Sequence, residues 1–160
     1  MINDHEALMG RIKENISDLK DVVARAELLL KKSEYTNDDG YLDGAALNLH
    51  GFYSGVEQIF KDIARTVDKS IPTSHSWHKD LLIQMSAELS SIRPSVIHKE
   101  TRHCLEEYLS FRHVVRNVYA FNLKSSRLKE LIQDLRVCFE SLQREMNSFI
   151  TFLEQIAGSK

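Results

Sequence analysis

The chain has 160 residues, of which 42% are hydrophobic and 28% charged, a composition typical of a folded globular protein with one domain. Its 21 basic and 23 acidic residues give a formal net charge of -2. This balance excludes a nucleic-acid-binding protein of the strongly basic kind, although it leaves room for a local basic patch. Only two prolines and six glycines are present, which argues against a β-sandwich or barrel and favours long helices.

The sequence also predicts a soluble cytoplasmic protein with no membrane segment. No stretch approaches about 18 uncharged apolar residues, and the first ten residues, MINDHEALMG, carry acids where a signal peptide would carry bases. The two cysteines, Cys104 and Cys138, are too few for a disulfide framework. We expect them to be separate small core residues in a reducing compartment.

Apolar residues recur at spacings of three and four along most of the chain, which predicts helices. In chain order, the five predicted helices cover residues 2–32, 43–69, 77–91, 97–123 and 125–157. Residues 31–40 and 70–77 are rich in turn formers and are predicted to be loops. The Arg93-Pro94 dipeptide is expected to end the third helix. The prediction is a single all-α domain over residues 1–160, an antiparallel helical bundle.

Three glycines fall close together in or near the second predicted helix. Each of Gly44, Gly51 and Gly55 costs about 0.8–1 kcal/mol relative to alanine inside a helix. A tight crossing with another helix explains such a cost, because small residues allow close approach. An equally good explanation for Gly44 is that it precedes the helix.

The seven histidines give no sign of a metal site, because none of them forms the i, i+4 pair that a helical zinc site uses. We expect solvated or capping side chains for all of them except His113. No glycine-rich phosphate loop and no GxSxG elbow occurs either. The sequence therefore predicts no metal and no cofactor.

When residues 111–123, FRHVVRNVYAFNL, are placed on a helix, the apolar and polar side chains fall on different faces. The apolar residues form one face, and the opposite side carries Arg112, His113, Arg116, Asn117 and Tyr119. Arg112, Arg116 and Tyr119 are at i, i+4 and i+7, so they line up along the helix surface.

Two guanidinium groups one turn apart repel each other unless an anion lies between them. A phosphate suits this position, because arginine presents planar paired donors to its oxygens. The alternative is a solvated face whose arginines pair with acids on other helices, with Glu106 and Glu107 supplying part of the compensation.

Four segments carry a family pattern: GFYSGVEQIFKDIA (51–64), SWHKDLL (76–82), IRPSVI (92–97) and EYLSFRHVVRNVYAF (107–121). Together they resemble the HEPN superfamily of small all-α domains, and most closely the HepT-like ribonuclease toxins of bacterial toxin–antitoxin pairs. The family signature is an Arg, a spacer of four to six residues and then a His, often followed by a Tyr two residues further on. Arg112 and Tyr119 match the first and last of these positions, whereas Asn117 stands where the family has His.

The resemblance implies metal-independent RNA cleavage with the ribose 2′-OH as the nucleophile. That route needs a base for the 2′-OH proton and cations to stabilise the charge on phosphorus. Arg112 and Arg116 fit the second role. Asn117 cannot act as a base, although its amide can orient a phosphate or ribose, and His113 is the nearby group that can replace the missing histidine.

The resemblance also implies partners. Family sites are built at a homodimer interface, where the fourth helices of two chains face each other, and the substrate is RNA. The cognate antitoxin is a nucleotidyltransferase that can attach AMP to the signature tyrosine, here Tyr119, and so place negative charge where RNA phosphate must bind. Tyr119 can alternatively be a structural aromatic residue at the edge of the core.

Other interpretations of the sequence remain open beside the ribonuclease. Glu57 is a further candidate for the site, as a clamp for an arginine, or else it is a solvated acid. The alternative function is a catalytically impaired HEPN module that binds a nucleotide or a partner. Asn117, in place of the family histidine, is the residue that indicates the loss of cleavage. A helical partner protein with no nucleotide role is the third.

Overall fold

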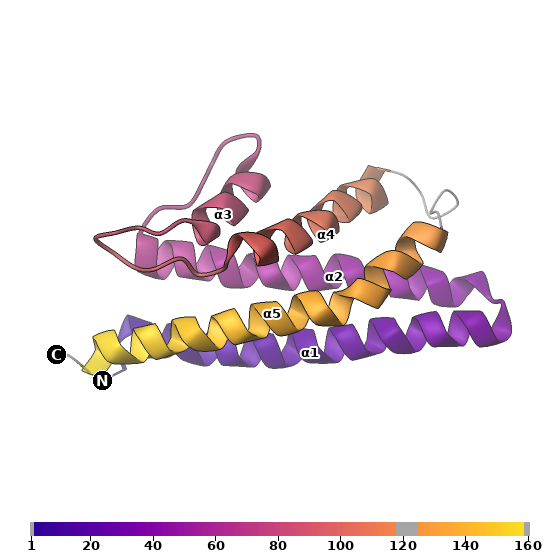
Figure 1. Ribbon diagram of the computed structural model, residues 1–160, viewed down its shortest axis with the longest axis horizontal. Helices are drawn as coiled ribbons and strands as arrows, with labels where there is room; N and C mark the ends of the chain where they lie inside the picture. Colours follow the sequence, from indigo (N-terminus) through magenta and orange to yellow (C-terminus); the bar gives the residue numbers. More distant parts are fainter. Residues whose placement is uncertain (1, 118–124, 159–160) are drawn as a thin grey trace.

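The computed structural model describes residues 2–117 and 125–158, with only the backbone described for residues 114–117. Within these ranges the chain is helical, and an isolated bridge between Leu89 and Arg93 is the sole β-type pairing. The elements are α1 (Asp4–Thr36), α2 (Asp39–Ile63), the π-helical turn η1 (Ala64–Asp68), α3 (Trp77–Ser86), α4 (Lys99–Asn117) and α5 (Ser125–Gly158). Successive long helices α1, α2, α4 and α5 run in opposite directions, which confirms the predicted antiparallel bundle (Figure 1).

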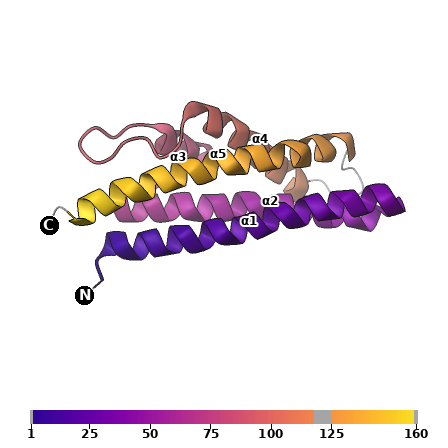
Figure 2. The same cartoon turned by 60° about the horizontal axis from the view of Figure 1, so that its bottom comes forward.

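A long hairpin of α1 and α2 forms one side of the bundle, and α5 packs along α1 (Figure 2). The prediction of a loop over residues 31–40 is wrong, because only Asn37 and Asp38 separate the two helices. Asn37 adopts the left-handed conformation (φ 55°) that asparagine tolerates at a helix end, and the Asp38 carboxylate accepts a hydrogen bond from Gly40 N. The turn-forming residues are thus compressed into a two-residue connection.

The glycines of α2 explain how closely α1 approaches. A Cβ atom on Gly55 would lie 2.6 Å from Cδ2 of Leu19, and one on Gly44 would lie 3.2 Å from Cδ1 of Leu29. Gly51 faces open space. Gly44 lies inside α2, so the explanation that places it before the helix is wrong and the tight crossing is confirmed.

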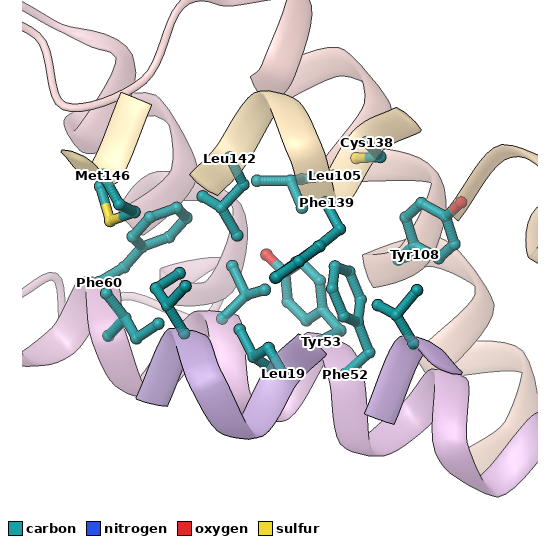
Figure 3. Packing of buried hydrophobic residues seen from close by; sticks show 14 of the residues in the cluster. Leu19, Phe52, Tyr53, Phe60, Leu105, Tyr108, Cys138, Phe139, Leu142 and Met146 are labelled. Carbon is teal, nitrogen blue, oxygen red and sulfur yellow. The ribbon is translucent and has the colours of Figure 1, made fainter. Parts of the chain in front are cut away.

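The core lies where α2, α4 and α5 meet α1 (Figure 3). Phe52 of α2 packs edge-on against Tyr108 of α4 and Phe139 of α5, with ring centroids 5.6 and 6.4 Å apart. The Tyr108 hydroxyl donates a 2.6 Å hydrogen bond to the carbonyl of Leu131, so its polar end is satisfied inside the core. These contacts tie α4, which carries the family signature, to both of its neighbours.

The third helix ends at Ser86, five residues earlier than predicted, because a buried arginine organises the following segment. All five N–H groups of Arg93 are matched: two bond Asp68 at the end of η1, and three bond the carbonyls of Gln84, Ala87 and Pro94. Ala87 and Pro94 belong to irregular backbone, and the Gln84 carbonyl lies in the last turn of α3, where it also accepts a hydrogen bond from Ala87 N. The arginine side chain therefore takes the place of secondary structure between α3 and α4.

The prediction for the cysteines is wrong. Cys104 of α4 and Cys138 of α5 form a disulfide, with their Cα atoms 6.0 Å apart. The two residues are 34 positions apart, and only the packing of α4 on α5 brings them together. The expectation of a reducing compartment relied on two separate thiols, and the disulfide removes that support. Over the ranges described above, no helix is long and apolar enough to span a bilayer.

Candidate functional site

A cluster of buried polar residues joins α2, α3 and α4 beside the core. Glu57 comes from the middle of α2, His78 from the first turn of α3, and Arg112 from the C-terminal half of α4. The loop that contains Pro72 turns the chain back after η1, so that α3 starts against α2. Residues far apart in sequence thereby meet at one place.

Arg112 and Glu57 form a bidentate ion pair. Arg112 Nη1 donates to Glu57 Oε1 at 3.1 Å and Nη2 donates to Oε2 at 3.2 Å. The Arg112 and Glu57 side chains are only 6% and 7% exposed. The helical wheel placed Arg112 opposite the apolar face. The structure pairs it with an acid on another helix, as one of the two explanations expected, but the pair is buried and not solvated. The suggestion that Glu57 clamps an arginine agrees with this geometry, whereas a solvated Glu57 does not.

The acids nearest in sequence do not neutralise Arg112. Glu106 pairs with Arg102, and Glu107 pairs with Arg127 of α5. Both pairs are partly exposed. The anion that compensates Arg112 therefore belongs to the protein itself, and it comes from another helix.

His78 completes the cluster. Its Nδ1 lies 2.7 Å from Glu57 Oε2 and 2.8 Å from Arg112 Nη2. Glu57 Oε2 can only accept and Arg112 Nη2 can only donate, so the tautomer of His78 decides which of the two contacts is a hydrogen bond. With the proton on Nδ1, the hydrogen bond is the one to Glu57. Arg112 Nη2 can direct its own hydrogens to Glu57 Oε2 instead. In the neutral ring this arrangement leaves the lone pair on Nε2.

Aromatic neighbours hold the His78 ring in place. The Trp77 indole stacks on it with ring centroids 3.6 Å apart, and Lys61 Nζ lies 4.5 Å from the centroid of the indole. The His113 ring meets His78 edge-on, with centroids 5.9 Å apart. The His78 side chain keeps 20% of its surface exposed, so one edge of the ring reaches solvent.

Tyr53 of α2, one turn before Glu57, packs against the Arg112 guanidinium. The Arg112 guanidinium lies 5.0 Å from the centroid of the Tyr53 ring. Burial raises the pKa of Tyr53 well above its ordinary range, and the negative charge of Glu57 raises it further. Tyr53 therefore stays neutral and offers Arg112 an aromatic face rather than a second anion.

Two buried arginine–carboxylate pairs occur in the described part of the chain, and they differ in how many of the arginine N–H groups find partners. Arg93 uses all five of its N–H donors, as described above. By contrast, Arg112 Nε is buried and finds no partner among the described residues. Arg102 Nε is also buried without a hydrogen-bond partner among the described residues, so this property alone does not define a site. The cluster of Glu57, His78 and Arg112 is the candidate functional site because it joins a buried ion pair to a partly exposed histidine.

The structure joins some of the predicted site residues and leaves others undescribed. Glu57 and Arg112 are in direct contact, and His113 lies next to their cluster through His78. Arg116 and Asn117 are in the last helical residues of α4, but their side chains lie outside the described part. Tyr119 lies outside the described residues altogether, as does the predicted helical stretch up to residue 123.

His78 is the site residue that sequence reasoning missed. It was expected to be solvated or capping, which is wrong, since it bonds both charged partners. The available signal was its place in segment 76–82, which resembles the family. A contact across 21 residues to Glu57 and 34 residues to Arg112 has no periodic trace in the sequence. Within the described ranges, no group of three or more His, Cys, Asp or Glu residues is placed to hold a metal ion.

Comparison with known proteins identifies the class. The family of HepT-like proteins matches residues 44–153, which include all three residues of the cluster. The match covers well over half of the chain. The chain belongs to the HepT-like family, as the four segments suggested. A comparison with curated proteins and one with solved structures found no match.

Proposed function

We propose that this protein is a metal-independent endoribonuclease and the toxin of a bacterial toxin–antitoxin pair. The observation that carries the proposal is the buried cluster of Glu57, His78 and Arg112 within the region that matches the HepT-like family. Buried charges next to a partly exposed histidine are costly for stability and are typical of sites that do chemistry.

The proposed reaction transfers a phosphoryl group within the RNA chain. The ribose 2′-OH attacks the neighbouring phosphorus, and the bond to the 5′ oxygen of the next nucleotide breaks. Arg112 supplies a fixed positive charge beneath the site, and Arg116 and the amide of Asn117 contact the phosphate. His113 takes part in proton transfer, because Asn117 cannot.

The proposal includes a homodimer whose two α4 helices face each other across a composite RNA-binding cleft. It also includes a cytoplasmic location and a nucleotidyltransferase antitoxin. AMP attached to Tyr119 by this antitoxin would add a phosphodiester charge close to the arginines of α4 and compete with the RNA phosphate. Size-exclusion chromatography with light scattering at micromolar concentration tests the dimer, and a monomer there contradicts the composite cleft.

Cleavage of RNA by the purified protein tests the function. The protein is produced without any antitoxin, mass spectrometry excludes AMP on Tyr119, and total tRNA or a defined mRNA is incubated with it in EDTA. We expect cleavage by the wild type and at least a tenfold loss in Arg116→Ala. Arg25→Ala, which changes an exposed arginine on α1, is the matched control and should cleave normally. Arg112→Lys keeps the buried charge but loses the paired donors, and it should also be impaired.

One outcome favours the alternative function. If the wild type leaves RNA intact but still binds it or a nucleotide, the protein is a binding module. Asn117, in place of the family histidine, is then the reason that cleavage is absent. A protein that does neither contradicts both functions.

A further inference from the structure

We propose that His78 is the catalytic base of this site, with its Nε2 taking the proton from the ribose 2′-OH, and that His113 is the acid that protonates the leaving 5′ oxygen. This inference rests on the proposed ribonuclease function. It assigns the acid–base chemistry to two residues outside the position of the family histidine. The two rings belong to different helices, α3 and α4, and meet beside the buried ion pair.

The proposal assigns one tautomer to His78. Arg112 Nη2 already donates to the Glu57 carboxylate, so the Nδ1 proton is placed on the contact with Glu57, which leaves Nε2 with its lone pair. A carboxylate that orients an imidazole in this way is the arrangement by which enzymes hold a histidine ready to accept a proton. Across the described part of the chain, no hydrogen bond engages Nε2.

Charged and titratable groups surround the His78 ring. Glu57 from α2 and Arg112 and His113 from α4 contact it, and Lys61 of α2 lies over the neighbouring Trp77. Glu57 and Arg112 form a buried bidentate ion pair, so His78 lies against two fixed charges of opposite sign.

Two contacts fix the orientation of the His78 ring. Trp77 stacks over one face of His78, with the ring planes 30° apart, and Glu57 holds the Nδ1 edge. Face and edge together leave the ring little freedom to rotate. The His78 side chain keeps 20% of its surface exposed, and the proposal places Nε2 at this open part, where a substrate can approach. A group held in this way loses little entropy when it reacts.

The second histidine, His113, performs the other proton transfer in this proposal. In the cleavage, the 2′ oxygen forms a bond to phosphorus as Nε2 of His78 takes its proton, and the bond from phosphorus to the 5′ oxygen breaks as His113 gives that oxygen a proton. The products are a 2′,3′-cyclic phosphate and a 5′-OH, and the enzyme has moved one proton from one histidine to the other. With the ring centroids 5.9 Å apart, one phosphate can lie within reach of both rings.

The decisive variant is His78→Asn. The asparagine amide can still donate to Glu57, but it has no basic nitrogen. We expect kcat to fall at least 100-fold, because general acid–base catalysis contributes about 10²–10⁴-fold. His75→Ala, three residues earlier in the exposed loop, is the matched control and should keep the wild-type rate. Thermal unfolding and circular dichroism check that both variants are folded.

Two further measurements separate chemistry from structure. The wild-type rate should rise and then fall with pH, and the acidic limb should disappear in His78→Asn and the alkaline limb in His113→Ala. Added imidazole should restore part of the activity of His78→Ala, because a small base can occupy the space left by the side chain. Glu57 is a positioning residue in this scheme, so Glu57→Gln should lower kcat and move the acidic limb without abolishing it.

The outcomes distinguish this inference from the function on which it rests. Cleavage by the wild type together with an unimpaired His78→Asn overturns the role of His78 and leaves the ribonuclease intact. Products that end in a 3′-hydroxyl overturn the 2′-OH route and both histidine assignments. An inactive wild type overturns the proposed function and the inference together. Loss of the acidic limb together with imidazole rescue supports both.

Discussion

Replacing Asp68 by asparagine removes the negative partner of the most deeply buried arginine in the described structure. Arg93 Nε and Nη2 donate to the two oxygens of Asp68 at 2.6 and 2.8 Å. The side chains are 0% and 1% exposed, so neither water nor a neighbouring acid can replace the lost charge. In the variant, the guanidinium remains buried without an anion, and the new amide can accept only one of the two hydrogen bonds.

The loss of stability follows from burial. Breaking a buried ion pair by removing one partner costs about 3–5 kcal/mol. For a chain of this size each kcal/mol lowers the melting temperature by about 2–4 °C, so Asp68→Asn should melt about 6–20 °C below the wild type.

The matched control is Asp62→Asn. Asp62 makes the same two-pronged contact with Arg11, at 2.7 and 2.9 Å, but the Arg11 side chain is 48% exposed. Exposed pairs contribute about 0.2–1 kcal/mol, so this variant should lose no more than about 1 kcal/mol. Both substitutions change the net charge by the same amount. Urea unfolding measures the two free energies and their m-values, and equal losses within 1 kcal/mol would refute the role given to burial.

Two further predictions concern how the helices are held together. Reducing the disulfide between Cys104 and Cys138 opens a loop of 34 residues, and the lost restriction of the unfolded chain should lower the free energy of unfolding by about 3.8 kcal/mol. The melting temperature with and without a reductant measures this effect. A variant with serine at both positions is the control, and its melting temperature should not change with the reductant. Gly51→Ala should raise the free energy of unfolding by about 0.8–1 kcal/mol, because its Cβ meets open space. Gly55→Ala should be about 1–3 kcal/mol less stable than Gly51→Ala, because its Cβ would lie 2.6 Å from Leu19, and equal stabilities would contradict the close crossing.

The periodic parts of the fold could be predicted from the sequence. The apolar stripes of α1 and α5 set their positions to within a few residues, because such long helices bury one regular face. The connections could not be predicted. Asn37 and Asp38 end one helix and start the next with two residues, and local turn propensity does not say how many residues a turn will use. The early end of α3 depends on Arg93 and on contacts with Asp68, 25 residues earlier.

The site was only partly predictable for the same reason. Arg112 stood out by its family pattern, and Glu57 was a candidate for its partner. Burial of the pair, however, depends on which face of α4 meets α2, and a wheel built on one helix cannot show this. The role of His78 and the pairing of Cys104 with Cys138 are contacts between different helices, which leave no pattern within either one.

The matched hydrogen bonds of Arg93 have a consequence for how this protein can change during evolution. The segment between α3 and α4 carries no residue of the candidate site, yet it sets where His78 on one helix stands relative to Arg112 on the next. A side chain with five bonds in a fixed fork tolerates neither a lysine nor a shift of one position in the segment. Insertions should therefore be confined to other loops. The residues of this segment should be as difficult to replace as those of the candidate site, although they never touch a substrate.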